Sequence, residues 1–374
     1  MRADRFIEIL GAEFYTGVPD SQLRSLCDCL MDRFGISKEH IIAANEGNAV
    51  AIAAGYYLST GKTPVVYLQN SGIGNIVNPV ASLMNERVYN IPCIFVVGWR
   101  GEPGVHDEPQ HIFQGMITQR LLEDIEIDTF VVRESTTENE LLQKMENYRA
   151  MLKEGRSVSF IIAKNALETE QKYVYSNGYS LNRETAIRKI AELSGDGIVV
   201  STTGKISREL FEIREKLGQG HEKDFLTVGS MGHSSSIALG IALQKPDRKV
   251  WCIDGDGAAL MHMGALAVIG NRKPGNMVHV VINNEAHETV GGMPTVGSTL
   301  CFSQMALICG YEKTYTVENS DELEKALINC KNQSELSFVE VKAAIGSRKD
   351  LGRPTRTPEE NREAFMKYLC ISEK

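Results

Sequence analysis

Short apolar runs alternate with longer segments of helical periodicity along almost the whole chain. Apolar runs bounded by turn residues predict buried strands, and apolar positions three and four apart predict helices that cover them. The first half contains such runs at 13–18, 40–44, 65–68, 94–97, 130–132 and 157–163. The second half repeats them at 197–201, 225–228, 250–253, 277–282, 313–317 and 337–341. A helix between consecutive strands makes them parallel, so the pattern predicts an α/β protein with two doubly wound, mainly parallel sheets.

The weakest periodicity lies at residues 166–181, which we assign to a linker between a first domain, 1–165, and a second domain, 182–374. Ser21 is expected to cap a helix at 22–33, because a serine oxygen can accept from the first free N–H groups of a helix. Further helices are predicted at 2–10, 48–58, 183–193, 234–243, 303–309, 321–330 and 359–369.

With 374 residues the chain fits two domains of ordinary size. The net charge of -8 and the isoelectric point near 5.6 give no general attraction to nucleic acid or anionic membrane, so neither is expected as a partner. We expect no membrane span and no signal peptide, because no apolar stretch is long enough. The eight cysteines include no CxxC pair, which favours reduced thiols and a cytoplasmic location.

The segment 249–290 predicts a strand, a turn, a helix and a second strand. The turn Asp254–Gly257 follows the first strand, and Asn283-Asn284 ends the second one. The carboxyl ends of neighbouring parallel strands meet at one edge of a sheet, where open α/β proteins bind their ligands. Asp256 and Asn284 are therefore predicted to lie near each other at this edge.

The residue types at this edge suit a Mg²⁺ ion that carries a diphosphate, because Mg²⁺ prefers a few carboxylate or amide oxygens together with phosphate oxygens. The predicted ligands are Asp256, Asn284 and the backbone carbonyl of Ala286. Gly255 and Gly257 let the backbone approach a phosphate, and a helix that begins at Ala258 would offer free N–H groups to it. A GDG tripeptide alone is common in plain turns, so the prediction depends on the Asn-Asn that follows.

This arrangement of GDG, helix and strand ending in Asn-Asn resembles the thiamine-diphosphate enzymes. The resemblance implies thiamine diphosphate and Mg²⁺ as cofactors. It also implies the thiamine-diphosphate-binding fold, with a pyrimidine-binding first domain, a diphosphate-binding second domain and no middle domain. Glu46 follows a strand and precedes an Ala-rich helix. The resemblance makes it the glutamate that hydrogen-bonds the aminopyrimidine ring; otherwise it is an acid favoured at a helix start.

The same resemblance implies further cofactor contacts, each with a plainer alternative. Met231 would support the bent cofactor and the Gly229 carbonyl would accept from its amino group, although a lone methionine is usually a core residue. Thr203 and Gly204 open a helix and are candidates for phosphate contacts or a simple cap. Asn70 lies in a stretch that lines the active side of the pyrimidine domain. That stretch lacks the third glycine of a dinucleotide motif, which argues against an oxidoreductase.

Motifs at 15–21, 107–111, 287–292 and 347–355 narrow the resemblance to the phosphonopyruvate decarboxylase group, with sulfopyruvate decarboxylase as the nearest relative. The likeness covers essentially the whole chain. Pyruvate decarboxylases place a glutamate six residues after the metal asparagine, where this chain has Val290. Glu288 is not equivalent to it, so no proton donor is carried over. The candidates for proton handling are Asp20, His111 and His287, with surface or capping roles as the alternatives.

The implied reaction is the decarboxylation of phosphonopyruvate to phosphonoacetaldehyde and CO₂, which makes the chain a carbon–carbon lyase. Sulfopyruvate or another 3-substituted pyruvate remains open as the substrate, and a non-catalytic phosphate-binding subunit is the rival class. The family binds its cofactor between domains of different subunits, which implies a homo-oligomer. An anionic substrate of this acidic chain needs a cationic patch, for which the basic loop supplies Arg348, Lys349 and Arg353; a solvated loop is the alternative.

Overall fold

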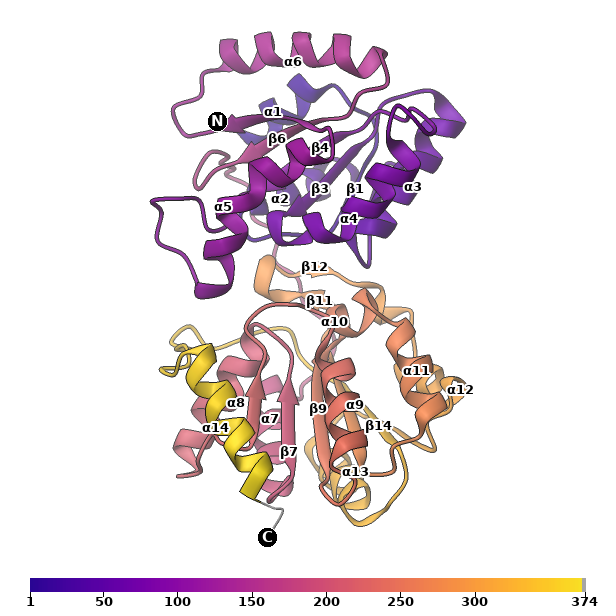
Figure 1. Cartoon of the computed structure of the whole chain (residues 1–374), viewed down its shortest axis with the longest axis vertical. Helices are drawn as coiled ribbons and strands as arrows, with labels where there is room; N and C mark the ends of the chain where they lie inside the picture. Colours follow the sequence, from indigo (N-terminus) through magenta and orange to yellow (C-terminus); the bar gives the residue numbers. More distant parts are fainter. Residues whose placement is uncertain (372–374) are drawn as a thin grey trace. The chain divides into compact units, whose positions relative to one another are not determined.

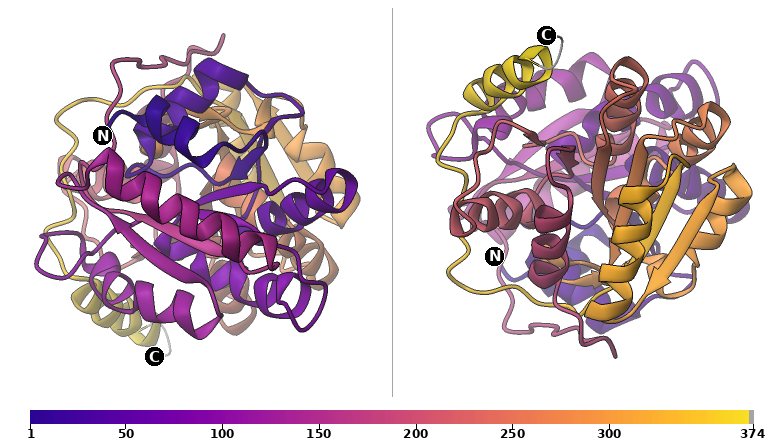
Figure 2. Two further views of the ribbon diagram at one scale, coloured as in Figure 1. Left: turned by 90° about the horizontal axis from the view of Figure 1, so that it is seen from above. Right: turned by 90° about the horizontal axis from the view of Figure 1, so that it is seen from below.

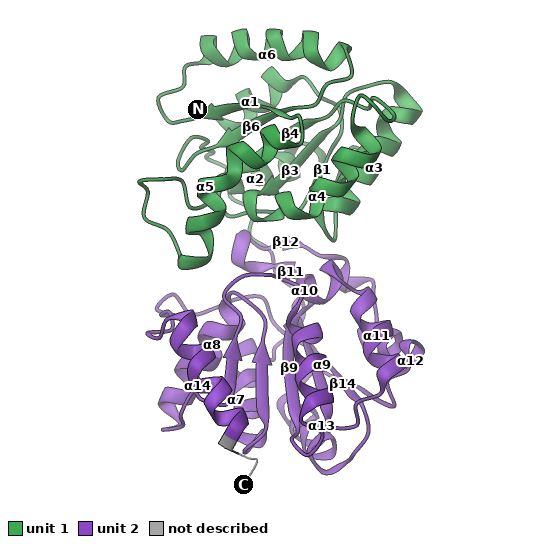
Figure 3. Ribbon diagram, in the orientation of Figure 1, with its two compact units in different colours: residues 1–174 green, residues 175–374 purple. Residues whose placement is uncertain are grey.

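The computed structural model describes residues 1–371 and divides into two compact units (Figure 3). Unit 1 is Met1–Val174, and unit 2 begins at Tyr175. This boundary falls inside the segment 166–181 that the sequence assigns to a linker. Each unit has its own six-stranded sheet, and each is therefore described by itself.

Unit 1 is built on a fully parallel sheet with the order β2-β1-β3-β4-β6-β5 (Figure 1). Its strands are β1 (Tyr15–Gly17), β2 (His40–Ile42), β3 (Val65–Gln69), β4 (Ile94–Gly98), β5 (Asp128–Val132) and β6 (Val158–Ile162). The central strands β4 and β6 are buried along their whole length. Burial on both faces explains why these strands appear in the sequence as continuous apolar runs and not as alternating ones.

Helices cover both faces of this sheet, as the view from above shows (Figure 2). On one side α1 packs against α2 and α6, and on the other α4 packs against α3 and α5. The helices are α1 (Ala3–Leu10), α2 (Arg24–Phe34), α3 (Glu46–Thr60), α4 (Ile73–Pro79), α5 (Pro109–Asp124) and α6 (Glu138–Lys153). The small residues Ala49, Ala53 and Ala54 of α3 belong to the buried core, which lets this helix approach the sheet closely.

Unit 2 repeats this topology with the order β13-β14-β10-β9-β7-β8. Its strands are β7 (Ile198–Ser201), β8 (Asp224–Leu226), β9 (Val250–Gly255), β10 (Met277–Asn283), β13 (Lys313–Val317) and β14 (Ser337–Lys342). A small antiparallel hairpin joins β11 (Ala286–His287) to β12 (Met293–Pro294). When the six sheet strands of each unit are counted in chain order, both sheets read 2-1-3-4-6-5. The prediction of two doubly wound, mainly parallel sheets is confirmed.

The faces of the second sheet are covered in the same way, by α7, α8 and α13 in one group and by α9, α11 and α12 in another. The helices are α7 (Arg183–Leu193), α8 (Lys205–Lys216), α9 (Ser234–Gln244), α10 (Asp256–Met261), α11 (Gly264–Arg272), α12 (Phe302–Cys309), α13 (Ser320–Asn332) and α14 (Pro358–Ile371). Within residues 1–371, none of the helices combines the length and the apolar character that a membrane crossing requires.

The shared strand order gives each unit one switch point. At this point two neighbouring strands are followed by connections that run toward opposite edges of the sheet. This point lies between β1 and β3 in unit 1 and between β7 and β9 in unit 2. Loops diverge at the carboxyl ends of such a strand pair and open a crevice, which is where ligands bind to sheets of this kind. Candidate ligand-binding residues are therefore expected at the carboxyl edge of each sheet.

The predicted start of the helix after the GDG turn is wrong. The helix α10 begins at Asp256, with Gly255 in an extended conformation before it, and Ala258 lies inside the helix. An acidic side chain in the first turn is favoured by the positive end of the helix dipole, which accounts for the earlier start. The crossover from β9 to β10 also consists of two short helices, α10 and α11, where one was expected.

The predicted cap of α2 is also wrong. The residue before this helix is Leu23, and no side chain caps it. The turn is instead held by Asp20, whose carboxylate accepts from the Gln22 N–H at 3.0 Å and whose carbonyl accepts from the Leu23 N–H at 3.1 Å. The Ser21 hydroxyl accepts from Arg100 Nη1 at 3.1 Å. The sequence suggested Ser21 because it precedes the apolar periodicity, but a tertiary contact occupies its hydroxyl.

Candidate functional site

Asp256 lies at the carboxyl edge of the unit 2 sheet, immediately after β9. Its side chain is 2% exposed, and Oδ2 accepts a hydrogen bond from Thr295 Oγ1 at 2.5 Å. Burial raises the pKa of Asp256 to about 6, although the Thr295 hydroxyl and the Gly257 N–H oppose this shift. Burying a carboxylate with no cation beside it destabilises the fold, so such a group is commonly a ligand of a bound cation.

Asn284 follows β10, the neighbour of β9 in the sheet. Its Nδ2 donates to Glu288 Oε2 at 2.8 Å, and its Oδ1 accepts from the Ala286 N–H at 3.2 Å. Glu285 between them has a φ of 62°, in the left-handed region, which turns the chain into β11. The hairpin then brings Thr295 back, and the Thr295 N–H donates to the Glu285 carbonyl at 2.9 Å. The structure thus gathers both predicted side-chain ligands under one hairpin.

Met231 reaches the same turn from another loop. A Cβ placed on Gly257 would lie 3.3 Å from Met231 Cε and 3.2 Å from His287 Nδ1, so three segments meet there and an added side chain would crowd them. The loop from Gly229 between β8 and α9 passes through a left-handed residue at Ser230, with a φ of 53°. Burial lowers the pKa of His287 to about 4, so its imidazole is neutral near pH 7.

The loop after β7 adds Thr203 and Gly204 to this edge. Thr203 Oγ1 donates to the Val228 carbonyl at 2.7 Å, which ties the loops after β7 and β8 together. Gly204 has a φ of 91°, and a Cβ there would lie 3.3 Å from Thr289 Oγ1 in the hairpin. A residue with a side chain would be strained at this position, so the glycine permits the close approach of loop and hairpin.

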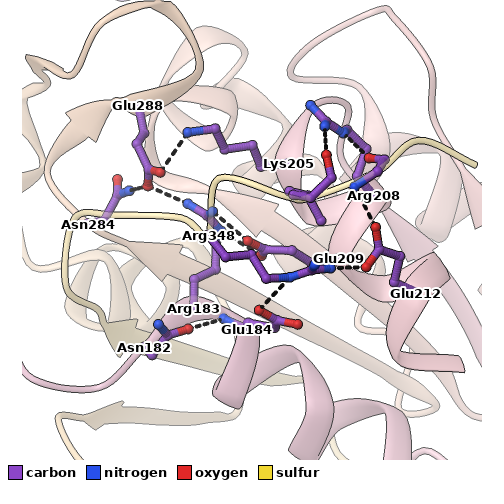
Figure 4. Close-up of polar contacts among 12 residues, drawn as sticks. Asn182, Arg183, Glu184, Lys205, Arg208, Glu209, Glu212, Asn284, Glu288 and Arg348 are labelled. Carbon is purple, nitrogen blue, oxygen red and sulfur yellow. Dashed lines mark hydrogen bonds and ion pairs between the residues drawn. The ribbon is translucent and has the colours of Figure 1, made fainter. Parts of the chain in front are cut away.

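The basic loop that follows β14 is fastened to the start of α7 and to α8 (Figure 4). Arg348 pairs with Glu184 at 3.2 Å, with Asp350 at 3.2 Å and with Glu212. Arg208 Nε donates to the Gly352 carbonyl at 2.6 Å. These contacts tie the Arg348 guanidinium to carboxylates of unit 2, whereas the alternative stated from the sequence was a solvated loop. Lys349 and Arg353 are exposed.

At the carboxyl edge of unit 1, Glu46 is the first residue of α3 and is 5% exposed. The preceding residue, Asn45, caps the helix through a bond from the Asn48 N–H at 2.9 Å. Glu46 Oε2 accepts from Asn75 Nδ2 at 2.7 Å. A Cβ on Gly72 would lie 2.5 Å from Glu46 Cδ, so this carboxyl group rests directly on a glycine. The carboxylate is therefore held at a fixed place beside the loop after β3.

Asp20 lies at the switch point of unit 1, where β1 and β3 end. It is fully buried and accepts from Gln69 Nε2 at 2.5 Å. Burial raises the pKa of Asp20, while Gln69 and the nearby Arg100 lower it less strongly. Asp20 therefore keeps its proton to a higher pH than an exposed aspartate does, which suits a group that transfers protons.

His111 lies near the start of α5, and its Nδ1 is buried without a hydrogen-bond partner among residues 1–371. Burial, together with a smaller effect of Arg100, lowers the pKa of His111 to about 4. Arg100 Nη2 pairs with Asp107 Oδ1 at 2.5 Å. Asn70 holds this segment in place, because its Nδ2 donates to the Arg100 carbonyl at 2.7 Å and to Thr118 Oγ1 at 2.8 Å. Both amide hydrogens of Asn70 are thus used inside unit 1.

Sequence reasoning did not find several partners of these groups: Gly72, Asn75, Arg183 and Thr295. Asn75 and Gly72 stand in the stretch that the resemblance places on the active side of the pyrimidine domain, but only Asn70 was selected from it. Thr295 and Arg183 carry no sequence signal, because they reach the site from segments distant in the chain. The only hint was Glu288, which the sequence singled out without a role.

Comparison with known proteins gives the family. The model described as "Thiamine pyrophosphate enzyme, N-terminal TPP binding domain" matches residues 4–124, and the corresponding C-terminal TPP binding domain matches residues 203–341. The chain belongs to the thiamine pyrophosphate enzymes. Thiamine pyrophosphate and thiamine diphosphate are the same compound.

Full-length relatives of this family member are decarboxylases. It is 34% identical to phosphonopyruvate decarboxylase of Streptomyces viridochromogenes, over 96% of this chain and 92% of that protein. The phosphonopyruvate decarboxylase of Streptomyces hygroscopicus is 33% identical, over 96% of this chain and 91% of that protein. Sulfopyruvate decarboxylase of Methanosarcina acetivorans is 27% identical over 98% and 97%. The likeness to phosphonopyruvate and sulfopyruvate decarboxylases noted in the sequence is confirmed.

The residues at the unit 2 edge fit the cofactor of a thiamine pyrophosphate enzyme. Asp256 and Asn284 offer a carboxylate and an amide oxygen, the hard donors that Mg²⁺ prefers, and a cation bound there would stabilise the buried Asp256 carboxylate. Gly257 keeps the space between Met231 and His287 clear of a side chain, and Gly204 does the same beside Thr289.

Proposed function

We propose that the protein is a thiamine-diphosphate-dependent and Mg²⁺-dependent decarboxylase of phosphonopyruvate, with phosphonoacetaldehyde and CO₂ as products. The observation that carries the proposal is the likeness to phosphonopyruvate decarboxylase over nearly the whole length of both chains. It is supported by the pairing of a buried carboxylate with an asparagine at adjacent strand ends, which is the donor set that a Mg²⁺-diphosphate requires. Sulfopyruvate is the second candidate substrate, on the full-length likeness to sulfopyruvate decarboxylase.

In this proposal unit 2 holds the diphosphate end of the cofactor. The metal ligands are Asp256, Asn284 and the Ala286 carbonyl. Gly255, Gly257 and the loop at Thr203 and Gly204 allow the backbone to come close to the phosphates. Ala258 contributes through its backbone inside the first turn of α10. Met231 supports the cofactor at the point where it meets Gly257, and the Gly229 carbonyl accepts from the amino group.

In unit 1, Glu46 is proposed to hydrogen-bond the aminopyrimidine ring of the cofactor. When bound, the cofactor supplies the electron sink that makes loss of CO₂ from a 2-oxo acid possible. Asn75 and Gly72 keep the Glu46 carboxylate from turning away, so that it donates and accepts a proton at one fixed place. A fixed carboxylate in a water-poor site acts more strongly than one in solution.

Asp20, His111 and His287 are proposed to handle the protons of the reaction. The raised pKa of Asp20 favours the protonated form, which can deliver a proton, whereas burial lowers the pKa of both histidines and keeps them neutral at pH 7. Asn70 is proposed to act indirectly, because its amide hydrogens hold the segment that carries Arg100. Lys349 and Arg353 remain the proposed contacts for the anionic substituent, and Arg348 positions their loop.

We further propose a homo-oligomer in which unit 1 of one copy and unit 2 of another share an active site, and a cytoplasmic location, with which the eight free cysteines agree.

The test is a CO₂-release assay with thiamine diphosphate and Mg²⁺ on phosphonopyruvate, sulfopyruvate and pyruvate. The highest kcat/KM is expected for phosphonopyruvate, and removal of Mg²⁺ with a chelator should abolish turnover. Preference for sulfopyruvate would assign the second candidate. Absence of CO₂ release from all three acids, with cofactor bound, would favour a non-catalytic subunit.

A further inference from the structure

The side chain of Asn284 is held in one orientation by a neighbouring acid. An asparagine can offer a metal only its oxygen, because its nitrogen carries two hydrogens. A half-turn of the amide would exchange the two atoms and present the nitrogen instead. In this chain Nδ2 of Asn284 donates to Glu288 Oε2 at 2.8 Å. The Glu288 carboxylate on Nδ2 and the Ala286 N–H on Oδ1, the latter at 3.2 Å, therefore fix together which way the amide faces.

Glu288 is itself fixed by two cations, and the close-up in Figure 4 shows all three side chains pointing toward one another. Lys205 Nζ lies 2.8 Å from Glu288 Oε1, and Arg183 Nη1 pairs with Glu288 Oε2. A carboxylate placed between two cations accepts hydrogen bonds, so the atom of Asn284 that bonds Glu288 is the amide nitrogen.

Arg183 is anchored in turn by a buried acid on α8. Its Nε and Nη2 donate to Glu209 Oε2 at 2.8 Å and Oε1 at 2.7 Å, which is a two-pronged pair of fixed direction. The side chains of Arg183 and Glu209 are 5% and 1% exposed. Arg183 and Lys205, the first residues of α7 and α8, thus fix the Glu288 carboxylate, and Glu288 in turn fixes Asn284.

The same hairpin also fixes Asp256, the other proposed side-chain ligand of the metal. Thr295 Oγ1 donates to Asp256 Oδ2 at 2.5 Å, and the Gly297 N–H donates to that hydroxyl oxygen at 3.0 Å. This bond fixes the position of Asp256 Oδ2. Both candidate ligands are therefore oriented from one segment, residues 286–298, although they belong to different strand ends.

We propose that Glu288 is a positioning residue for the metal ligand Asn284: anchored by Arg183 and Lys205, it turns the amide so that the oxygen faces the Mg²⁺. The inference rests on the proposed function, in which Asn284 binds the metal. The plain alternative is that Glu288 only neutralises two buried cations. The alternatives differ in one measurable quantity, because only the first makes Mg²⁺ affinity depend on Glu288.

The test measures thiamine diphosphate binding by calorimetry at a series of Mg²⁺ concentrations, which needs no turnover. Glu288→Gln should raise the Mg²⁺ concentration for half-saturation by about 10- to 100-fold, the usual effect of removing a group that orients a metal ligand. The matched control is Glu212→Gln, which removes the carboxylate that pairs with Arg348. Within the part of the chain that the structure describes, Glu212 makes no hydrogen bond with Asn284, so the Mg²⁺ concentration for half-saturation should stay unchanged. Circular dichroism verifies that each variant is folded.

A second variant tests the pair directly and reverses its hydrogen bond. Asn284→Asp alone places two carboxylates at the 2.8 Å contact, and they repel each other. Asn284→Asp combined with Glu288→Gln restores a donor and an acceptor, so the double variant should bind Mg²⁺ at least tenfold more tightly than Asn284→Asp.

Three outcomes separate the claims. Unchanged Mg²⁺ dependence in Glu288→Gln, or no gain in the double variant, would overturn the positioning role while the proposed function stands. No Mg²⁺-dependent cofactor binding by the unmodified protein would overturn the proposed function itself. The expected loss and recovery support both.

Discussion

The contact between Glu46 and Gly72 gives the sharpest prediction for unit 1. Gly72 has a φ of −79° and a ψ of −7°, which alanine adopts readily, so Gly72→Ala adds one methyl group without backbone strain. The new Cβ would lie 2.5 Å from Glu46 Cδ and 2.6 Å from Cγ. Neither distance is possible between carbon atoms that are not bonded, so the carboxyl group or the loop must move.

The size of the movement follows from these distances. An ordinary contact needs at least 3.4 Å, so Glu46 Cδ must shift by about 0.9 Å (3.4 − 2.5). The hydrogen bond from Asn75 Nδ2, now 2.7 Å long, would be stretched or lost. A displacement of about 1 Å at a reacting group costs on the order of 10²-fold in rate, or about 2.7 kcal/mol of barrier.

The assay compares kcat for CO₂ release, the exchange of the cofactor C2 proton followed by NMR in D₂O, and the Kd of the cofactor. We expect Gly72→Ala to lower kcat and the exchange rate by about 100-fold. The Kd should change little, because Asp256 and Asn284 belong to unit 2. Gly74→Ala is the matched control, since a Cβ there meets nothing within 4 Å, and it should keep wild-type rates. Wild-type C2 exchange in Gly72→Ala would refute the reasoning that a fixed Glu46 carboxylate is required.

Three further predictions concern the metal, a buried ion pair and pH. Asp256→Ala should abolish Mg²⁺-dependent binding of thiamine diphosphate and leave the circular dichroism spectrum intact; calorimetry with wild-type affinity would remove Asp256 from the metal site. Arg183→Met leaves Glu209 and Glu288 buried without their shared cation, which should cost about 3–5 kcal/mol and lower the unfolding temperature of unit 2 by roughly 6–20 °C in scanning calorimetry. A shift below 2 °C would contradict this. Burial lowers the pKa of His221 to about 4, so the folded chain resists a proton that the unfolded chain takes up below about pH 6.5. Stability should therefore fall between pH 6.5 and pH 4, and less steeply in His221→Asn; parallel urea-midpoint profiles would argue against it.

The sequence alone determined the architecture and the position of the GDG turn, Asp254–Gly257, at which we propose the metal binds. Strands that are buried on both faces must be apolar throughout, so the runs near Val96 and Val280 were visible without any structure. The order strand, helix, strand makes β9 and β10 parallel neighbours, and their ends carry Asp256 and Asn284. These features depend on residues that are close in the sequence, so the apolar pattern and the residue spacing were sufficient to predict them.

Only the tertiary structure decided how these side chains are held. Thr295 reaches Asp256 across 39 residues, Asn75 reaches Glu46 across 29, and Arg183 meets Glu288 across 105. The orientation of a carboxylate or an amide depends on which donor lies beside it in space, and no local pattern encodes a partner at such separations.

The basic loop shows the same limit. Charge spacing made it a candidate for binding an anion, but Arg348 pairs with Glu184 and Glu212, which lie far away in the sequence, as well as with the neighbouring Asp350. A run of cations is attracted by an anionic ligand and by the chain's own carboxylates through the same Coulomb force. Only the folded positions of those carboxylates decide between the two.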